Sequence, residues 1–222
     1  MHSPEDEIVK GLVEKEMTKL SDNDKMNLFL KLIDEGRIPN FSPLLPLVLT
    51  LDGKPYSLDN HFQFETLFYI RMPKSTVLKT GRQVGKSTVG AAHGVITCTS
   101  IPYFRTLYIT PLFEQVRRLS NNYVRPFVEQ SPIRSLWLGN NTENSVLQRS
   151  FRNYSMMQFS FALLDADRVR GVKADKLVID EVQDIDKDLI PIIKETMSAS
   201  PWAISQYTGT PKGPENTIEG LW

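Results

Sequence analysis

A short stretch of this chain has the residue types and spacing of a loop that binds phosphate. The stretch consists of Thr80, Gly81, Arg82, Gln83, Val84, Gly85, Lys86, Ser87 and Thr88. In such a loop the backbone N–H groups of the turn and of the following helix start point to one spot and bind phosphate oxygens. We expect Lys86 to reach the β- and γ-phosphates of a nucleotide and the Ser87 hydroxyl to bind Mg²⁺. The match to the pattern G-x-x-x-x-G-K-[ST] is incomplete, because Thr80 stands at the first glycine.

Two adjacent carboxylates, Asp180 and Glu181, directly follow the apolar run Leu177–Ile179. Adjacent acids at the end of a core strand are costly unless a cation or a proton transfer uses them. We expect Asp180 to hold Mg²⁺ through water and Glu181 to polarise the water that attacks the γ-phosphate. The alternative is a pair of acids that caps a helix N-terminus. The phosphate-binding pattern earlier in the chain favours the catalytic interpretation.

A third polar segment, Thr208-Gly209-Thr210, follows the next apolar run after the acids. Threonine hydroxyls on a tight glycine turn beside the γ-phosphate are suited to detect whether that phosphate is present. The tripeptide alone is a weak signal, since turns commonly contain glycine and hydroxyl residues. Its place one strand after the acids predicts a coupling role.

Gln63 lies between Phe62 and Phe64, upstream of the loop. A glutamine amide can pair with the N6/N7 edge of adenine while an aromatic ring stacks on the base. This would favour ATP over GTP. A surface glutamine in an amphipathic helix explains the pattern equally well, so both interpretations stay open.

Three arginines are placed to stabilise charge on a phosphate that is being transferred. Arg168 and Arg170, the latter followed by Gly171, precede the acids, and either could act within its own chain or across a subunit interface. Ordinary surface arginines are the alternative. Arg82 lies inside the loop itself, where we expect a γ-phosphate contact or a switching ion pair.

Strands and helices must alternate to position these residues. The patterns predict strands at 75–80, 105–110, 177–180 and 202–208 and helices at 86–98, 113–123 and 187–197, with two further β-like runs at 145–151 and 157–163. Such alternation indicates an α/β fold with a parallel sheet covered by helices on both faces. Ligands of these sheets bind at the carboxyl ends of the strands, where the polar segments above fall.

Residues 1–57 are expected to form an appendage and residues 58–222 the nucleotide-binding core. Apolar residues at helical spacing predict two small amphipathic helices before Gly36. The following segment, 37–56, contains Pro39, Pro43, Pro46 and Pro55 and is predicted to be an irregular connector.

Composition places the chain among soluble intracellular proteins. Twenty-six basic and 26 acidic residues cancel, so the bulk charge favours neither nucleic acid nor membrane. The modest excess of arginine in residues 105–152 fits either phosphate contact or a solvated face. A single cysteine, Cys98, excludes an internal disulfide. We find no pattern of a signal peptide or membrane span.

Taken together, these motifs resemble the ATPase domain of the large terminase subunit, the genome-packaging motor of tailed bacteriophages. Residues 80–87 are close to the terminase loop form [ST]-x-R-Q-x-G-K-[ST]. The family also has an upstream adenine motif with glutamine, an Arg-Gly before an apolar-Asp-Glu strand and a T-[TG]-T-P coupling motif. These match Gln63, Arg170-Gly171, Ile179-Asp180-Glu181 and Thr208-Gly209-Thr210-Pro211, and the resemblance covers residues 58–222.

The resemblance implies a P-loop ATPase of the RecA-like (ASCE) class that uses ATP and Mg²⁺ to move double-stranded DNA into a procapsid. It implies a homo-oligomeric ring, pentameric in the family, on a portal protein, with a small terminase subunit that selects the DNA. The isolated chain could be a monomer. The site of action would be the host cell cytoplasm, with no membrane involved and no place in the mature virion. Arg170 would be the arginine finger, with Arg168 and Arg82 as alternatives.

Large terminases also carry a C-terminal nuclease with a cluster of metal-binding acids. Nothing in this sequence matches it, and the chain ends soon after the coupling motif, so we expect a truncated chain without nuclease activity. Arg117, Arg118 and Arg125 are our candidates for gripping DNA.

The alternative function is the first RecA-like domain of a superfamily 2 helicase or DNA translocase, since Asp180-Glu181-Val182-Gln183 also fits a D-E-x-x box. A helicase would need a second such domain, which this chain lacks. A nucleotide-binding scaffold without turnover is a third possibility, against which Glu181 argues.

Overall fold

The computed structural model describes residues 41–69, 72–139, 142–162, 169, 171–213 and 218, together with residues 21, 24, 27, 31 and 35. The two helices predicted before Gly36 therefore lie almost entirely outside the described residues. Arg168 and Arg170 also lie outside them.

A six-stranded sheet organises the chain, in the order β3-β8-β7-β4-β6-β5. Its strands are β3 (Ser75–Lys79), β4 (Arg105–Thr110), β5 (Gln148–Ser150), β6 (Met156–Phe161), β7 (Lys176–Ile179) and β8 (Ile204–Gly209). All neighbouring pairs are parallel except β5 with β6, which is antiparallel. The predicted parallel sheet is confirmed. The edge strand β5 differs because only residues 151–155 separate it from β6, which is too short for a parallel crossover.

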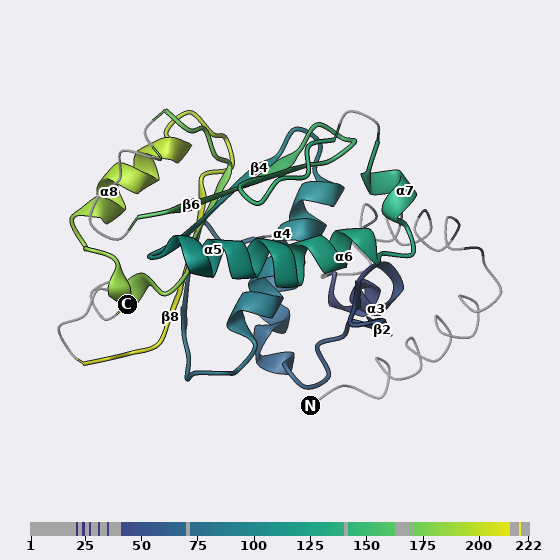
Figure 1. The fold of residues 1–222 in the computed structure, drawn as a ribbon, viewed down its shortest axis with the longest axis horizontal. Coiled ribbons are helices and arrows are strands. Elements are labelled where there is room, and N and C mark those ends of the chain that lie inside the picture. Colours follow the sequence, from purple (N-terminus) through teal and green to yellow (C-terminus); the bar gives the residue numbers. More distant parts are fainter. Residues whose placement is uncertain are drawn as a thin grey trace.

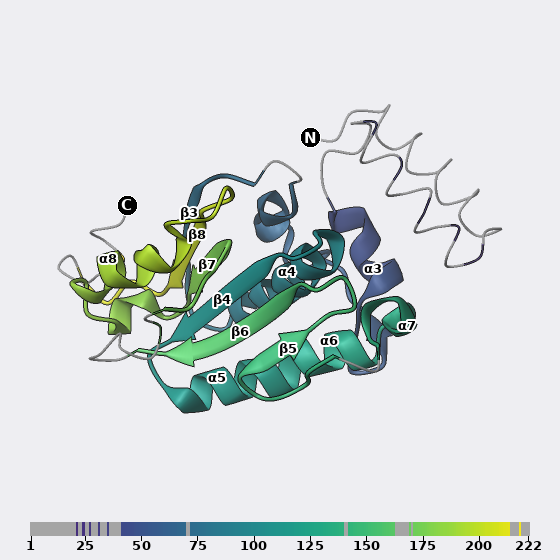
Figure 2. The ribbon, with the colours of Figure 1, turned by 90° about the horizontal axis from the view of Figure 1, so that it is seen from above.

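Helices cover both faces of this sheet (Figures 1 and 2). Tyr108 and Val178 belong to the core that includes residues of helix α4 (Lys86–Ser100). Leu107 and Ile179, which neighbour them on the same two strands, belong to a second core with helix α8 (Leu189–Lys194). Successive side chains of a strand point to opposite faces. Strands buried on both sides read as continuous apolar runs, which is why the sequence pattern located them.

The predicted helix at 113–123 is longer in the structure. Helix α5 (Phe113–Leu119) continues through a π-helical turn, η3 (Ser120–Val124), into α6 (Arg125–Glu129). Pro126 does not break the helix, because it lies in the first turn of α6, where a missing N–H is tolerated. The buried Arg149 donates to the Ser120 backbone carbonyl at 3.2 Å and so pins the π-helical turn.

The described part of the connector predicted at 37–56, residues 41–56, is more ordered than expected. It contains η1 (Ser42–Leu44), helix α3 (Leu45–Val48) and a short hairpin of β1 (Thr50–Leu51) and β2 (Lys54–Pro55). Its apolar residues join the core around α4, and the ring of Tyr56 contacts Phe127 edge-on, with centroids 4.9 Å apart. Pro43 and Pro46 lie at helix starts and Pro55 lies in an exposed hairpin strand, so this part folds against the core in spite of them.

The remaining elements are short. They are η2 (Phe62–Phe68), α7 (Arg134–Trp137), η5 (Val182–Asp184) and η6 (Glu195–Met197). The helix predicted at 187–197 thus begins at Leu189 and ends in the 3-10 turn η6. Within the ranges that the structure describes, no helix has the length and apolar character needed to span a membrane.

Candidate nucleotide-binding site

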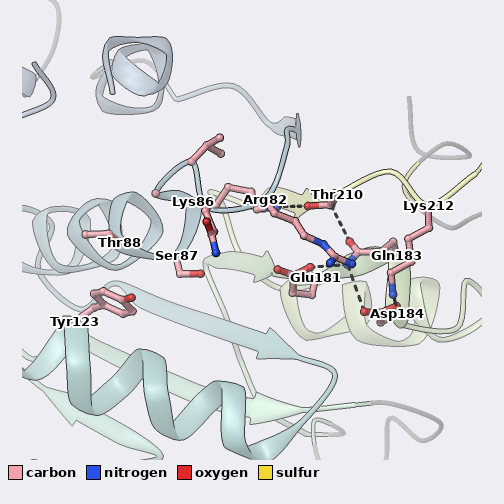
Figure 3. Close-up of a pocket in the computed structure, with 13 residues that line it drawn as sticks. Arg82, Lys86, Ser87, Thr88, Tyr123, Glu181, Gln183, Asp184, Thr210 and Lys212 are labelled. Atoms are coloured by element: carbon pink, nitrogen blue, oxygen red, sulfur yellow. Dashed lines mark hydrogen bonds and ion pairs between the residues drawn. The ribbon is translucent and has the colours of Figure 1, made fainter. Parts of the chain in front are cut away.

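The phosphate-loop sequence, the acids and the Thr208–Thr210 segment meet at one edge of the sheet. They lie at the ends of β3, β7 and β8, which are adjacent parallel strands, so their carboxyl ends lie together. The tight turn predicted at Thr208–Thr210 is wrong, because Thr208 and Gly209 are the last residues of strand β8 and pair with Leu78 and Lys79 of β3. The segments border a cleft of about 370 Å³, a volume typical of small-ligand sites. Its walls are formed by Arg82, Gln83, Val84, Gly85, Lys86, Ser87, Thr88, Tyr123, Glu181, Gln183, Asp184, Thr210 and Lys212. In Figure 3, Glu181, Gln183 and Lys212 lie on one side of Lys86, and Thr88 and Tyr123 on the other.

The loop between β3 and α4 curls tightly. Gln83 and Gly85 have φ values of 59° and 82°, in the left-handed region. The backbone at Gly85 also passes close to the His61 ring, since a Cβ there would lie 2.9 Å from Nε2. Helix α4 begins at Lys86. Its first N–H groups have no partner within the helix, which makes this turn suited to bind an anion.

Lys86 is buried under this loop, with 8% of its surface exposed. Its ammonium donates to the Thr210 hydroxyl at 2.7 Å and lies 3.5 Å from the Gly81 carbonyl. Both partners are neutral. The positive charge of Lys86 is therefore available to a phosphate in the cleft.

Asp180 is the most heavily hydrogen-bonded side chain of the site. Its Oδ2 accepts from the Tyr108 hydroxyl at 2.8 Å and the Ser87 hydroxyl at 3.3 Å, and its Oδ1 accepts from the Thr208 hydroxyl. Burial, followed by the negative charge of Asp180, raises the pKa of Tyr108 well above its ordinary value, so Tyr108 stays protonated and remains a donor. These contacts hold the carboxylate in one orientation.

The donor set of Ser87 and Asp180 fits Mg²⁺. One hydroxyl and one carboxylate lie 3.3 Å apart at the start of the phosphate-binding helix. Mg²⁺ is usually bound by one or two carboxylates together with waters and substrate phosphates. The described residues contain no cluster of three or more His, Cys, Asp or Glu side chains that could hold a metal by themselves.

Glu181 has a strained backbone. Its φ and ψ are 50° and 42°, in the left-handed region that residues other than glycine rarely adopt. Such outliers cost on the order of 1–3 kcal/mol and gather at functional sites. The turn directs the Glu181 carboxylate into the cleft, where it accepts a short hydrogen bond from the Gln183 amide.

Not every predicted site residue lines the cleft. Thr80, Gly81, Thr208 and Gly209 lie behind it: the Thr80 N–H donates to the Gly209 carbonyl at 3.2 Å, and Thr208 orients Asp180. Gln63 is exposed in η2 and is not among the lining residues, although neighbouring His61 contacts the loop at Gly85. The structure does not bring Gln63 into the cleft. Arg168 and Arg170 lie outside the described residues.

Sequence reasoning missed several residues that the structure places here. Tyr108 bonds to Asp180, and Tyr123, Gln183, Asp184 and Lys212 line the cleft. Gln183 and Asp184 had a detectable signal, since they directly follow the paired acids. Tyr108 and Tyr123 had none, because each lies inside an ordinary strand or helix pattern.

Comparison with solved structures shows which fold this is. The bacteriophage HK97 large terminase aligns with a TM-score of 0.66 and 13% identity over 81% of this chain and 39% of that chain. The large terminase ATPase domain of Thermus phage P74-26 aligns with a TM-score of 0.52 and 18% identity, over 69% of this chain and 70% of that one. The large terminase of the thermophilic bacteriophage D6E aligns with a TM-score of 0.56 and 14% identity, over 73% of this chain and 42% of that chain.

The chain has the fold of a phage large-terminase ATPase domain. The expected α/β, P-loop NTPase architecture is thereby confirmed, as is the resemblance at the level of the fold. The chain spans less than half the length of the HK97 and D6E proteins. The D6E terminase has also been solved in complex with ADP and with ATP-γ-S. Neither protein-family models nor curated proteins gave a match to the sequence.

Proposed function

We propose that this chain is an ATP-hydrolysing motor domain of a terminase large subunit. The observation that carries the proposal is the convergence of Lys86, Ser87 and Asp180 at the start of α4, with Glu181 beside them in the same cleft. This is the arrangement that phosphoryl transfer needs: a phosphate cradle, a metal site and a carboxylate that acts on water. The fold shared with phage terminases supports the same conclusion.

Each residue has a defined part in the proposed reaction. The loop residues 80–88 and the first turn of α4 hold the phosphates, and Lys86 moves from the Thr210 hydroxyl to the β- and γ-phosphates. Ser87 and Asp180 would hold Mg²⁺, which neutralises phosphate charge when bound. Glu181 accepts a proton from the attacking water. Thr208, Gly209 and Thr210 transmit the state of the γ-phosphate.

The work that hydrolysis powers is, in this proposal, translocation of double-stranded DNA into a procapsid. The chain would act in a homo-oligomeric ring, a pentamer, on a portal protein with a small terminase subunit, in the host cell cytoplasm. Arg170 would reach a neighbouring site, with Arg168 and Arg82 as alternatives. Arg118 is exposed on α5. Among the residues that the structure describes, the exposed Arg117 pairs with the exposed Glu114, and the exposed Arg125 pairs with the half-buried Glu129. Exposed ion pairs of this kind are weak, so these arginines remain able to bind DNA phosphates.

Phosphate release from ATP tests the proposal, measured over a range of chain concentrations with and without linear double-stranded DNA. We expect ATP-γ-S binding to saturate at millimolar nucleotide. We also expect slow ATP turnover that EDTA abolishes. Turnover per chain should rise with chain concentration, because the arginine finger comes from a neighbouring subunit. Absence of nucleotide binding, or turnover that persists in EDTA, would refute the proposal. A change in the rate of ATP hydrolysis on addition of DNA would support the motor role. An unchanged rate would argue against it.

A further inference from the structure

Gln183 connects Glu181 of the cleft to Thr210, which directly follows strand β8. It lies in η5, directly after β7, and both ends of its side-chain amide are engaged (Figure 3). The Nε2 group donates to Glu181 Oε2 in a short hydrogen bond, and Oε1 accepts from the Thr210 N–H at 3.0 Å. Nε2 also lies 3.4 Å from Asp184 Oδ2. One side chain thus bridges two segments that are far apart in the sequence.

The packing at Gly209 shows that this bridge is built closely. A Cβ at Gly209 would lie 2.3 Å from Gln183 Oε1 and 3.3 Å from Val182 Cγ1. The φ of Gly209 is not in the left-handed region, so space rather than backbone conformation requires glycine here. The amide of Gln183 therefore lies directly against Gly209, with no room for a side chain between them.

The bridge continues to the lysine of the phosphate-binding loop. The Thr210 hydroxyl accepts from Lys86 at 2.7 Å, while the Thr210 N–H donates to Gln183. A continuous series of hydrogen bonds thus joins Lys86, Thr210, Gln183 and Glu181. When Lys86 turns to a phosphate, it must give up the Thr210 hydroxyl, because its new partners lie in the cleft.

We propose that Gln183 is a positioning residue that sets the Glu181 carboxylate according to the position of Thr210 at the end of β8. This inference rests on the proposed function of Glu181 as the group that activates water. In the structure Gln183 bonds both to Glu181 and to the Thr210 N–H. Release of the Thr210 hydroxyl by Lys86 frees Thr210 to shift, and the amide of Gln183 moves Glu181 with it. The acid is thereby aimed only when a phosphate occupies the loop.

The chemistry of the bridge is specific to glutamine. One amide supplies a donor to the carboxylate and an acceptor to the backbone N–H. Methionine has nearly the same shape but neither function. Glutamate keeps the acceptor, but as a carboxylate it cannot donate a hydrogen bond to Glu181 Oε2.

The test compares Gln183→Met and Gln183→Glu with the wild type. Gln130→Met is the matched control, because Gln130 is exposed and is not among the residues that line the cleft. For Gln183→Met we expect kcat to fall at least tenfold and KM for ATP to change less than threefold. The Thr210 amide should exchange hydrogen faster, since its acceptor is gone. Gln183→Glu should also lower kcat, because it cannot donate to Glu181, but it should leave the Thr210 amide protected, because it keeps the acceptor.

Two failures are distinguishable. If the wild type hydrolyses ATP and Gln183→Met matches it in kcat, the positioning role is wrong while the proposed function stands. An unchanged kcat in Gln183→Glu would also refute it. If the wild type shows no hydrolysis, the proposed function fails, and faster exchange of the Thr210 amide then still reports whether the bridge exists.

Discussion

Single residues of this chain carry charge in places where charge is costly. Glu181 lies on a strained turn, Asp180 is buried among hydroxyl donors, and Lys86 is buried with only neutral partners. In the proposed function Lys86 binds phosphate, Asp180 holds Mg²⁺ and Glu181 activates water, which accounts for these three charges. The proposed function does not account for Lys176. It is 1% exposed at the start of β7, and its ammonium lies 2.7 Å from Nδ1 of the buried His93.

Lys176 should make the stability of the fold depend on pH. Burial lowers the pKa of Lys176 from 10.5 to about 7. As pH falls from about 10.5 to 7 the unfolded chain therefore takes up a proton that the folded chain does not. The free energy of unfolding then decreases by up to about 1.4 kcal/mol per pH unit in this window, and it levels off below pH 7 as far as Lys176 is concerned.

Chemical denaturation at pH 7, 8 and 9 measures this slope. The range stays above the lowered pKa of His93. Burial raises the pKa of Cys98 from 9.0 to about 12, so toward pH 9 the unfolded chain loses a proton that the folded chain keeps. This contribution opposes that of Lys176 and is also present in the Lys176→Met variant. Lys176→Met should flatten the slope, and Lys194→Met, at an exposed position of α8, should leave it unchanged. An equal slope in Lys176→Met and the wild type would show that Lys176 is not the cause.

Among the elements, the phosphate-binding loop is held from outside as well as by its own backbone. Its position follows from β3 and α4, which the sequence pattern predicts within a few residues. The contact of His61 with Gly85 was not predictable, because it joins η2 to the loop across a segment with no periodic pattern. The same holds for the packing of residues 44–58 into the core, where prolines suggested an irregular connector.

Gly85→Ala should disturb this loop in two separable ways. An L-residue at φ 82° costs roughly 1–2 kcal/mol, and the added Cβ would lie 2.9 Å from His61 Nε2. We expect a loss of stability together with weaker ATP-γ-S binding. Gly53→Ala is the matched control, because Gly53 has a φ of 74° but nothing within 4 Å of an added Cβ.

Denaturation curves and nucleotide titrations of both variants separate the two effects. Gly53→Ala should lose stability with unchanged nucleotide affinity. Adding His61→Ala to Gly85→Ala removes the contact and should restore part of the stability while leaving the backbone strain. If Gly85→Ala binds ATP-γ-S as tightly as the wild type, the left-handed turn at residue 85 is not needed for the phosphate cradle.

At the scale of the whole molecule, sequence order was enough to predict the fold class and the edge of the sheet where the site lies. Parallel strands bring their carboxyl ends together, so polar residues after 79, 179 and 209 had to meet. The side-chain contacts between those segments were not predictable. The hydrogen bonds of Gln183 to Glu181 and Thr210 depend on the left-handed backbone conformation of Glu181. No residue type in that segment predicts this conformation.

An arginine finger from a neighbouring subunit predicts complementation between two inactive variants. Glu181→Gln retains its finger but has no catalytic carboxylate, and Arg170→Ala retains its own site but lacks the finger. Each should hydrolyse ATP poorly alone, and an equimolar mixture should regain turnover at interfaces that combine the two intact parts. Sedimentation shows whether the chains assemble. Assembly of the mixture without regained turnover would exclude an Arg170 finger that acts between subunits.

The most direct measurement is steady-state ATP hydrolysis by Glu181→Gln beside the wild type, with Mg²⁺-dependent ATP-γ-S binding followed in parallel. The substitution keeps the size of the side chain and removes the base. We predict unchanged nucleotide binding and a fall in kcat on the order of 10²- to 10⁴-fold, the usual contribution of a general base. Turnover equal to the wild type, with binding intact, would show that Glu181 does not activate the attacking water and would contradict the proposed mechanism.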